Sequence, residues 1–267
     1  YRGYMSLSKK RFSKFFFIFF AACSFTFCLF LTLDHLFPLP LPETEKDFAV
    51  AVLAEDGSPL RFFPDEQGIW RYPVQKKQVS PHYLEALINY EDRWYWRHPG
   101  INPWSLLRAL GVYIREGEPV LGGSTLTMQV ARLLDSHKKN IPGKLKQIFR
   151  ALQLEYHLSK QEILELYLNY APFGGPMQGV QAACYAYLGK PARELSRAEA
   201  ALMAVLPQAP SRLRPDRHPK RAQKARDKVL KRMASFGVWN EGTVLQAKKE
   251  KVNSRYDPHP MKAPLLA

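Results

Sequence analysis

Residues 80–102 read SPHYLEALINYEDRWYWRHPGIN, a stretch that changes from a helical pattern into an aromatic, charged loop. The Ser-Pro pair at its start is typical of a helix N-cap followed by proline in the first turn. Apolar side chains then recur at helical spacing, at Leu84, Leu87 and Ile88. Glu91 takes the next position of that stripe, where an apolar residue is expected.

A carboxylate in an apolar stripe is partly removed from water. Desolvation raises its pKa and makes it a better base near neutral pH, so Glu91 is the candidate general base. The alternative is a structural carboxylate that pairs with Arg93 or His98. Asp92 points about 100° away around the helix, where simple solvation explains it. His98 taken alone is more often structural than catalytic.

A second polar stretch, GGSTLTMQ, covers residues 122–129. Glycines followed by Ser124 and Thr125 predict a turn into a helix N-terminus, whose free N–H groups suit an anion. Thr127 and Gln129 add hydrogen-bonding groups along the next turn. Many ordinary turns share this pattern, so the interpretation needs support from neighbouring residues.

Basic residues follow directly, between residues 131 and 150, with Asp135 as their one acid. The six are Arg132, Lys138, Lys139, Lys144, Lys146 and Arg150. Such a cluster beside an anion site fits a pyrophosphate clamp, and a solvated basic face is the alternative. A further run of ten Lys or Arg between residues 212 and 232 is interpreted as a solvated or lipid-facing helix.

The remaining patterns predict a mainly α fold behind a short β-containing segment. Three runs indicate strands: FAVAVLA, LRFF and IWRYPV, all within residues 48–74. A helix is predicted from Asn102-Pro103 to about Gly117. Others are expected over 144–158, with an apolar stripe at Leu145, Ile148, Phe149 and Leu152, and over 219–235. Two capping boxes are predicted, Ser159 with Glu162 and Ser196 with Glu199.

Residues 15–33, FFFIFFAACSFTFCLFLTL, carry no charge. A helix of this length spans about 28 Å, close to the thickness of a bilayer core. Basic residues precede it and Asp34 follows, which places the N-terminus in the cytoplasm and the remainder outside. A cleaved signal peptide is the alternative, but no A-x-A-like site follows the run.

The chain of 267 residues has a formal charge of +15, which favours an anionic partner. Of three cysteines, Cys23 and Cys28 lie in the apolar run and Cys184 stands alone. The part outside that run therefore cannot form an internal disulfide, and it lacks the spacing of a structural zinc site.

Together these motifs resemble glycosyltransferase family 51, the glycosyltransferase domain of class A penicillin-binding proteins. Residues 91–102 resemble its first motif, E-D-x-x-F-x-x-H-x-G-[IF]-D, and residues 122–129 its second, G-G-S-T-I-T-Q-Q. Residues 144–155 resemble the third, R-K-x-x-E with a later L-E, and ILELYLN at 163–169 the fourth. The segments APFGG (171–175) and LPQAPSRLRPDRHP (206–219) are similar to the penicillin-binding protein 1C subgroup.

The sequence departs from the family pattern at several motif positions. Asn102 replaces an Asp, Met128 a Gln and Arg132 a Lys, while Gly143 replaces the Arg of the third motif and Gln147 its Glu. Gln147 keeps the length of glutamate but cannot carry its charge.

The resemblance implies a lysozyme-like, mainly α glycosyltransferase domain with its cleft near the membrane. Glu91 would be the general base that deprotonates the 4-hydroxyl of lipid II, the acceptor. That oxygen would then attack the anomeric carbon of the polyprenyl-linked glycan with inversion. The implied substrate-binding residues are Asp92, His98, Arg108, Ser124, Thr125, Gln129, Arg132, Lys139, Lys144, Lys146, Gln147, Glu155 and Glu162.

The expected organisation has six parts: 1–14, a cytoplasmic basic tail; 15–33, the transmembrane helix; 34–47, a linker; 48–79, the β-rich segment; 80–235, the glycosyltransferase domain; and 236–267, a linker toward a transpeptidase domain. No tightly bound cofactor or protein-held metal is expected, although Mg²⁺ or another divalent cation often takes part in the family. Expected partners are lipid II, the glycan strand, the membrane and other cell-wall synthesis proteins, with no nucleic acid. The expected location is the bacterial inner membrane, with a periplasmic domain.

Two other functions fit parts of the sequence. A lysozyme-like glycan-cleaving enzyme would use Glu91 as an acid, but it has no use for a cationic clamp and needs a second placed carboxylate to activate water if it inverts. A non-catalytic membrane scaffold is compatible with the altered motif positions. Incubation with lipid II separates the three, because they give polymer, cleaved glycan or no product.

Overall fold

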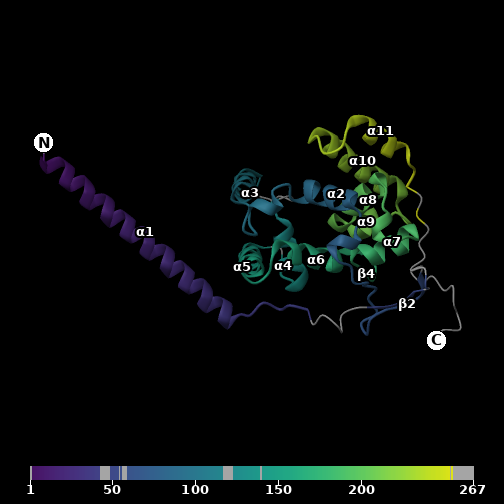
Figure 1. The fold of residues 1–267 in the computed structure, drawn as a ribbon, viewed down its shortest axis with the longest axis horizontal. Helices are drawn as coiled ribbons and strands as arrows, with labels where there is room; N and C mark the ends of the chain where they lie inside the picture. Colours follow the sequence, from purple (N-terminus) through teal and green to yellow (C-terminus); the bar gives the residue numbers. More distant parts are fainter. Residues whose placement is uncertain are drawn as a thin grey trace. The chain divides into compact units, whose positions relative to one another are not determined.

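The computed structural model describes residues 2–42, 49–53, 55, 59–116, 123–138, 140–252 and 254. It divides into two compact units, Tyr1–Pro40 and Leu41–Ala267. The larger unit is mainly helical, as predicted, and carries two small antiparallel hairpins among its described residues (Figure 1).

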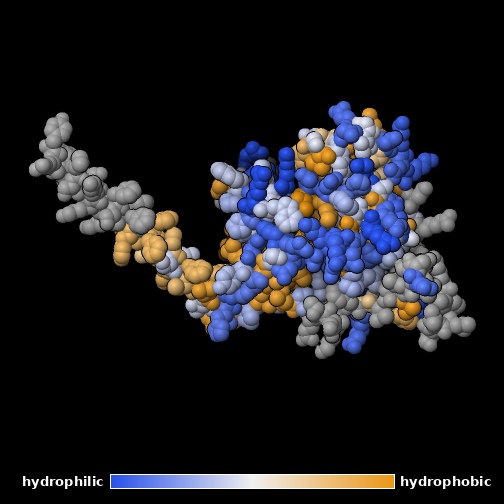
Figure 2. All heavy atoms as spheres, in the orientation of Figure 1, coloured by the Kyte–Doolittle hydropathy of each residue, from blue (hydrophilic) through white to orange (hydrophobic). Residues whose placement is uncertain are grey.

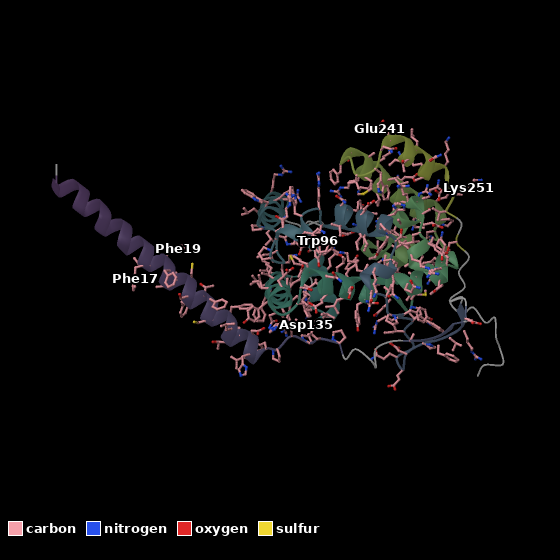
Figure 3. All side chains as sticks on the ribbon, in the orientation of Figure 1. Phe17, Phe19, Trp96, Asp135, Glu241 and Lys251 are labelled. Atoms are coloured by element: carbon pink, nitrogen blue, oxygen red, sulfur yellow. The ribbon has the colours of Figure 1, made fainter. Side chains whose placement is uncertain are left out.

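The smaller unit contains one helix, α1 (Arg2–Leu36). Its stretch Phe17–Leu36 is long and apolar enough to cross a membrane, and none of it is buried inside the protein. The described part of this helix is coloured hydrophobic over most of its surface in Figure 2, and Figure 3 shows Phe17 and Phe19 on it. The predicted helix over 15–33 is confirmed, whereas its insertion into a bilayer stays a prediction.

The β-rich segment is smaller than expected. Strand β1 (Val50–Leu53) pairs antiparallel with β2 (Pro59–Phe63). The third predicted strand, IWRYPV, is reduced to one bridge, in which Trp70 pairs with Met177. The Trp70 backbone accepts a hydrogen bond from Gln178 and donates one to Pro176. Both partners lie in the hairpin formed by β3 (Pro172–Gly174) and β4 (Met177–Gln178).

The core of the larger unit is a set of packed helices. Helix α8 (Arg197–Val205) packs against α2 (Pro81–Glu91) and α10 (Pro219–Ser235), and these two also touch each other (Figure 1). Helix α4 (Leu126–Leu134) packs between α5 (Ile141–His157) and α6 (Lys160–Tyr170). The α10 bounds match the predicted helix at 219–235.

The other elements connect or cover these helices. They are η1 (Lys76–Gln78), η2 (Tyr95–Arg97), α3 (Pro103–Glu116), α7 (Val180–Leu188), η3 (Ala192–Glu194), η4 (Leu206–Gln208), α9 (Pro210–Leu213) and α11 (Glu241–Lys249). Helix α3 begins at the predicted proline, but Gly117 and Gly122 lie outside the described residues.

Helix α2 buries a slightly different face from the predicted one. Its buried residues are Tyr83, Ala86, Leu87 and Tyr90, while Leu84 and Ile88 are half-buried. Glu91 therefore stands at the edge of the buried stripe rather than within it. Ser80 is the N-cap residue, but its hydroxyl donates to the Leu195 carbonyl instead of capping the helix.

The helix predicted over 144–158 is confirmed as α5, but its apolar stripe is not its buried face. The helix buries Gly143, Gln147, Ala151, Gln153 and Leu154, and leaves Leu145 62% exposed. The rest of the stripe, Ile148, Phe149 and Leu152, is half-buried. Both predicted capping boxes, at the starts of α6 and α8, are confirmed.

The stretch predicted as a C-terminal linker contains a packed helix, α11. Arg226 of α10 is 1% exposed and donates to the carbonyls of Lys248 and Glu250 at the end of α11. Trp239, which precedes α11 in the chain, is also buried, and its indole N–H donates to the Glu85 carboxylate of α2. Since α10 provides a buried partner for these carbonyls, the helical unit extends beyond residue 235.

Candidate active site

Glu91 is the last residue of α2, and side chains from two other elements hold its carboxylate. The Gln129 amide of α4 donates to Oε2 at 2.9 Å. The Gln208 amide of η4 donates to Oε1 at 2.7 Å. The two residues predicted to pair with Glu91 have other partners: the His98 imidazole contacts Asp92, and the Arg93 guanidinium stacks on Phe236.

The surroundings of Glu91 favour a base with an elevated proton affinity. Burial raises the pKa of the Glu91 carboxyl above its usual value, and the Asp92 charge adds to this. The two amide hydrogen bonds and the Arg232 guanidinium act in the opposite direction on the same pKa, but burial prevails. The Glu91 carboxylate is therefore a stronger base than an exposed glutamate.

Asp92 is not solvated, contrary to the simple interpretation of its helix position. It is 7% exposed, and its carboxylate accepts from the Leu126 backbone N–H at 2.9 Å and contacts His98 Nε2 at 3.0 Å. The Thr125 hydroxyl caps α4 by accepting from the Met128 N–H. Asp92 and His98 therefore connect the loop after Glu91 to the start of α4.

Gly100 brings the same loop against α5. Its φ is +79°, and a Cβ at this position would lie 2.7 Å from the Glu155 Cγ and 2.9 Å from the Ala151 carbonyl oxygen. The Thr125 hydroxyl donates to the Gly100 carbonyl. Only glycine fits here without displacement, so the loop, α4 and α5 are packed as one block.

Lys144 and Ser124 form the cationic part of the site. Lys144 Nζ donates to the Ser124 hydroxyl at 2.7 Å and to Gln147 Oε1 at 3.0 Å. Burial and the nearby Arg132 guanidinium lower the pKa of Lys144. Among the described residues neither Lys144 nor Arg132 has a carboxylate partner, so their charges are available to an anion.

Gln147 lies beside Lys144 on α5. It is 4% exposed and donates to the Met128 carbonyl at 2.6 Å. Its amide therefore ties α5 to α4 while its oxygen orients the Lys144 ammonium.

Gly143, where the family pattern has Arg, occupies a confined position. A Cβ there would lie 2.0 Å from the Lys138 carbonyl oxygen. The Asn140 side chain accepts from the Gly143 N–H and starts α5 at this point. The tight turn into α5 thus requires glycine directly before Lys144.

Several predicted site residues have other partners. Lys146 and Arg150 bind Asp135, which Figure 3 labels, at 2.6 and 2.8 Å. Glu155 pairs with Lys160 at 2.6 Å and accepts from the Thr127 hydroxyl at 2.6 Å. Glu162 is engaged in the capping box with Ser159.

Two further predicted residues are not brought to Glu91 by any described contact. Arg108 is exposed on α3. Lys139 lies outside the described residues. The described residues also contain no group of three or more His, Cys, Asp or Glu side chains that could hold a metal ion.

Sequence reasoning missed Gln208 and Arg232. Gln208 lies 117 positions from Glu91 in the chain, within the segment 206–219 that was noted only for its resemblance. The Arg232 guanidinium lies over the Tyr90 ring at 5.2 Å, so this end of the basic run faces the site rather than solvent or lipid alone. A proline on each side of Gln-Ala, which predicts a fixed turn after α8, was the available signal.

Comparison with known proteins identifies the family of the chain. The sequence model of the transglycosylase family matches residues 56–234, so the chain belongs to that family. It is 58% identical over 244 residues to penicillin-binding protein 1C of Escherichia coli (strain K12), which covers 90% of this chain and 31% of that protein. It is 35% identical over 217 residues to penicillin-binding protein 1A of Pseudomonas aeruginosa, with 81% and 26% covered.

The chain spans about a quarter to a third of the length of these relatives. A solved structure of penicillin-binding protein 1A from Haemophilus influenzae aligns with 80% of this chain and 22% of that one, at 22% identity and a TM-score of 0.45. The family model and the two relatives confirm, at the level of the family, the resemblance inferred from the four motifs.

Proposed function

We propose that this chain is a peptidoglycan glycosyltransferase that polymerises lipid II into glycan strands. The observation that carries the proposal is that α4 and the residues at its start contact both the candidate base and a lysine. Gln129 on α4 binds the candidate base Glu91, and Ser124 at its start binds Lys144. One short helix and the residues at its start therefore connect a proton acceptor to a cation that has no carboxylate partner in the described part of the chain.

The proposed step is an inverting glycosyl transfer. The ionised Glu91 carboxylate takes the proton of the acceptor 4-hydroxyl while that oxygen attacks the anomeric carbon of the donor. The new C–O bond forms as the bond from that carbon to the pyrophosphate oxygen breaks. The proton resides on Glu91 and must leave to solvent before the next turnover.

The leaving group is an anion, and Lys144 and Arg132 are proposed to bind it. Their interaction strengthens as negative charge develops on the pyrophosphate, so they stabilise the transition state more than the ground state. Pyrophosphate is already a good leaving group and needs no second acid, which agrees with the neutral Gln147 beside Lys144. A divalent cation, if used, would be held through the substrate's own phosphates, and no step requires it.

The location is part of the proposal. Helix α1 would anchor the chain in the bacterial inner membrane, with the N-terminus in the cytoplasm and the helical unit in the periplasm. Lipid II and the growing strand would both be presented at that membrane surface. Other cell-wall synthesis proteins are proposed as neighbours there, and no nucleic acid is expected to bind.

The test is polymerisation of purified lipid II by the full chain in detergent or liposomes. Glu91→Gln keeps the shape of the side chain but removes the base, so the rate should fall by about 10²–10⁴ with the melting temperature nearly unchanged. A folded variant with near-normal polymer output would refute the role of Glu91. Cleaved glycan or no product from the unmodified chain would support the hydrolase or the scaffold instead.

A further inference from the structure

Gln208 stands out because it binds the candidate base from the opposite side to Gln129. It is exposed at the end of η4, whereas the backbone that carries it is fixed by the buried Leu206. Each amide donates to a different oxygen of Glu91, at 2.9 Å from Gln129 and 2.7 Å from Gln208. Two donors on two oxygens fix the plane of the carboxylate as well as its position.

We propose that Gln208 is a positioning residue for the transfer reaction, whose amide holds the Glu91 carboxylate ionised and oriented toward the acceptor hydroxyl. This inference rests on the proposed role of Glu91 as the base. An amide that donates its N–H group prefers the charged carboxylate, since the protonated acid is the weaker acceptor. Each oxygen has a second lone-pair direction, so a substrate hydroxyl can still approach.

Several titratable groups surround Glu91, and they act on its pKa in both directions. On α2 and at its C-cap the titratable neighbours are Tyr83, Tyr90 and Asp92, and burial raises the pKa of both tyrosines. From other elements Tyr167 of α6 and Arg232 of α10 face the same group. Burial and the Asp92 charge raise the pKa of Glu91, whereas Arg232 and the two glutamines lower it.

Loss of the Gln208 bond should therefore favour the protonated, inactive form of Glu91. The acid limb of the pH profile of kcat/KM reports this ionisation in the free enzyme. Gln208→Leu should move that limb upward by about half to one pH unit, with activity returning toward the unmodified level at high pH. Gln208→Lys places a cation beside the carboxylate and should move the limb downward by about the same amount.

Opposite shifts for the two variants separate positioning from a general loss of structure. Gln246→Leu is the matched control, since Gln246 is an exposed glutamine on α11, and its acid limb should coincide with that of the unmodified chain. Unshifted limbs in both Gln208 variants, or shifts in the same direction, would overturn the proposal. Because Gln208 is exposed, melting temperatures should stay close to that of the unmodified chain.

A second measurement does not depend on turnover. The full chain in detergent micelles, with ¹³C in the glutamate carboxyls, is titrated by NMR without substrate, and the Glu91 resonance is the one missing from Glu91→Gln. Its midpoint should rise in Gln208→Leu and fall in Gln208→Lys. An unchanged midpoint refutes the proposal, whereas midpoints that shift as expected beside an active Glu91→Gln variant would refute only the role of Glu91 as base.

Discussion

The imidazole Nε2 of His98 lies 3.0 Å from both carboxylate oxygens of Asp92, and both side chains are buried. One of those oxygens also accepts from the Leu126 N–H at the start of α4. The residue after the candidate base thus secures the helix that carries Gln129. Asp92 therefore supports the site indirectly, because it holds His98 and the start of α4 in place.

Asp92→Ala should destabilise the helical unit by about 3 kcal/mol, because it leaves a buried imidazole and a buried N–H without their acceptor. Thermal unfolding followed by circular dichroism measures this. Glu66→Ala, which removes an exposed carboxylate, should change the melting temperature very little. Equal melting temperatures for the two variants would contradict the structural role of Asp92.

Lys144→Ala and Arg132→Ala should each lower the rate of lipid II polymerisation by about 10²-fold, since each removes a charge offered to the leaving pyrophosphate. Lys146→Ala should lose far less, because the Lys146 ammonium is bound to Asp135. Initial rates at saturating lipid II give the comparison. If the first two variants polymerise normally, the anion is bound elsewhere in the basic run.

Gln147→Ala should reduce the rate modestly, because Lys144 loses one of its two hydrogen-bond partners. Glu155→Gln and Glu162→Gln should keep most activity, since the Glu155 carboxylate pairs with Lys160 and that of Glu162 caps a helix. The same polymerisation assay applies to all three. A folded glutamate variant as inactive as Glu91→Gln would reveal a second catalytic carboxylate.

Gly143→Ala should destabilise the protein by about 1–3 kcal/mol and disturb Lys144, because the new Cβ would meet the Lys138 carbonyl oxygen at 2.0 Å. Gly242 of α11 provides the control, as the nearest atom to its Cβ would be 3.5 Å away. Gly242→Ala should be neutral or slightly stabilising. Chemical denaturation of both variants tests the difference in sign.

Residues 15–33 should remain attached and span the membrane. Protease added to spheroplasts should digest the region after residue 34 while the N-terminal tail is protected. Mass spectrometry of the membrane-bound protein checks the first residue. A mature N-terminus beyond residue 33 would identify the segment as a cleaved signal instead.

Local chemistry predicted the helix ends well. The Ser159 and Ser196 caps, and the helix over 219–235, depend on residues within one turn of each boundary, so their patterns are sufficient. Burial was harder to predict. Helix α5 exposes Leu145 and buries Gln147, whose amide donates to the Met128 carbonyl of α4.

The candidate site was predicted only in part, because motifs reveal some of its residues and tertiary packing brings in the others. Glu91, Gln129 and Lys144 lie in motifs with characteristic residue types, and the structure links each of them to α4. Gln208 has no motif of its own, and it reaches Glu91 only because α8 packs on α2. The pairing of Asp92 with His98 also depends on the turn at η2, which spacing alone does not reveal.

The close fit of Gly100 against α5 limits how this part of the chain could be engineered. Any library that varies position 151 or 155 to alter substrate choice would have to retain the glycine, since a Cβ there would already touch both residues. Larger side chains at either position would press on the loop that leads back to Glu91. Variation on the exposed face of α5, at Ile141 or Leu145, carries no such penalty and is where a redesign should begin.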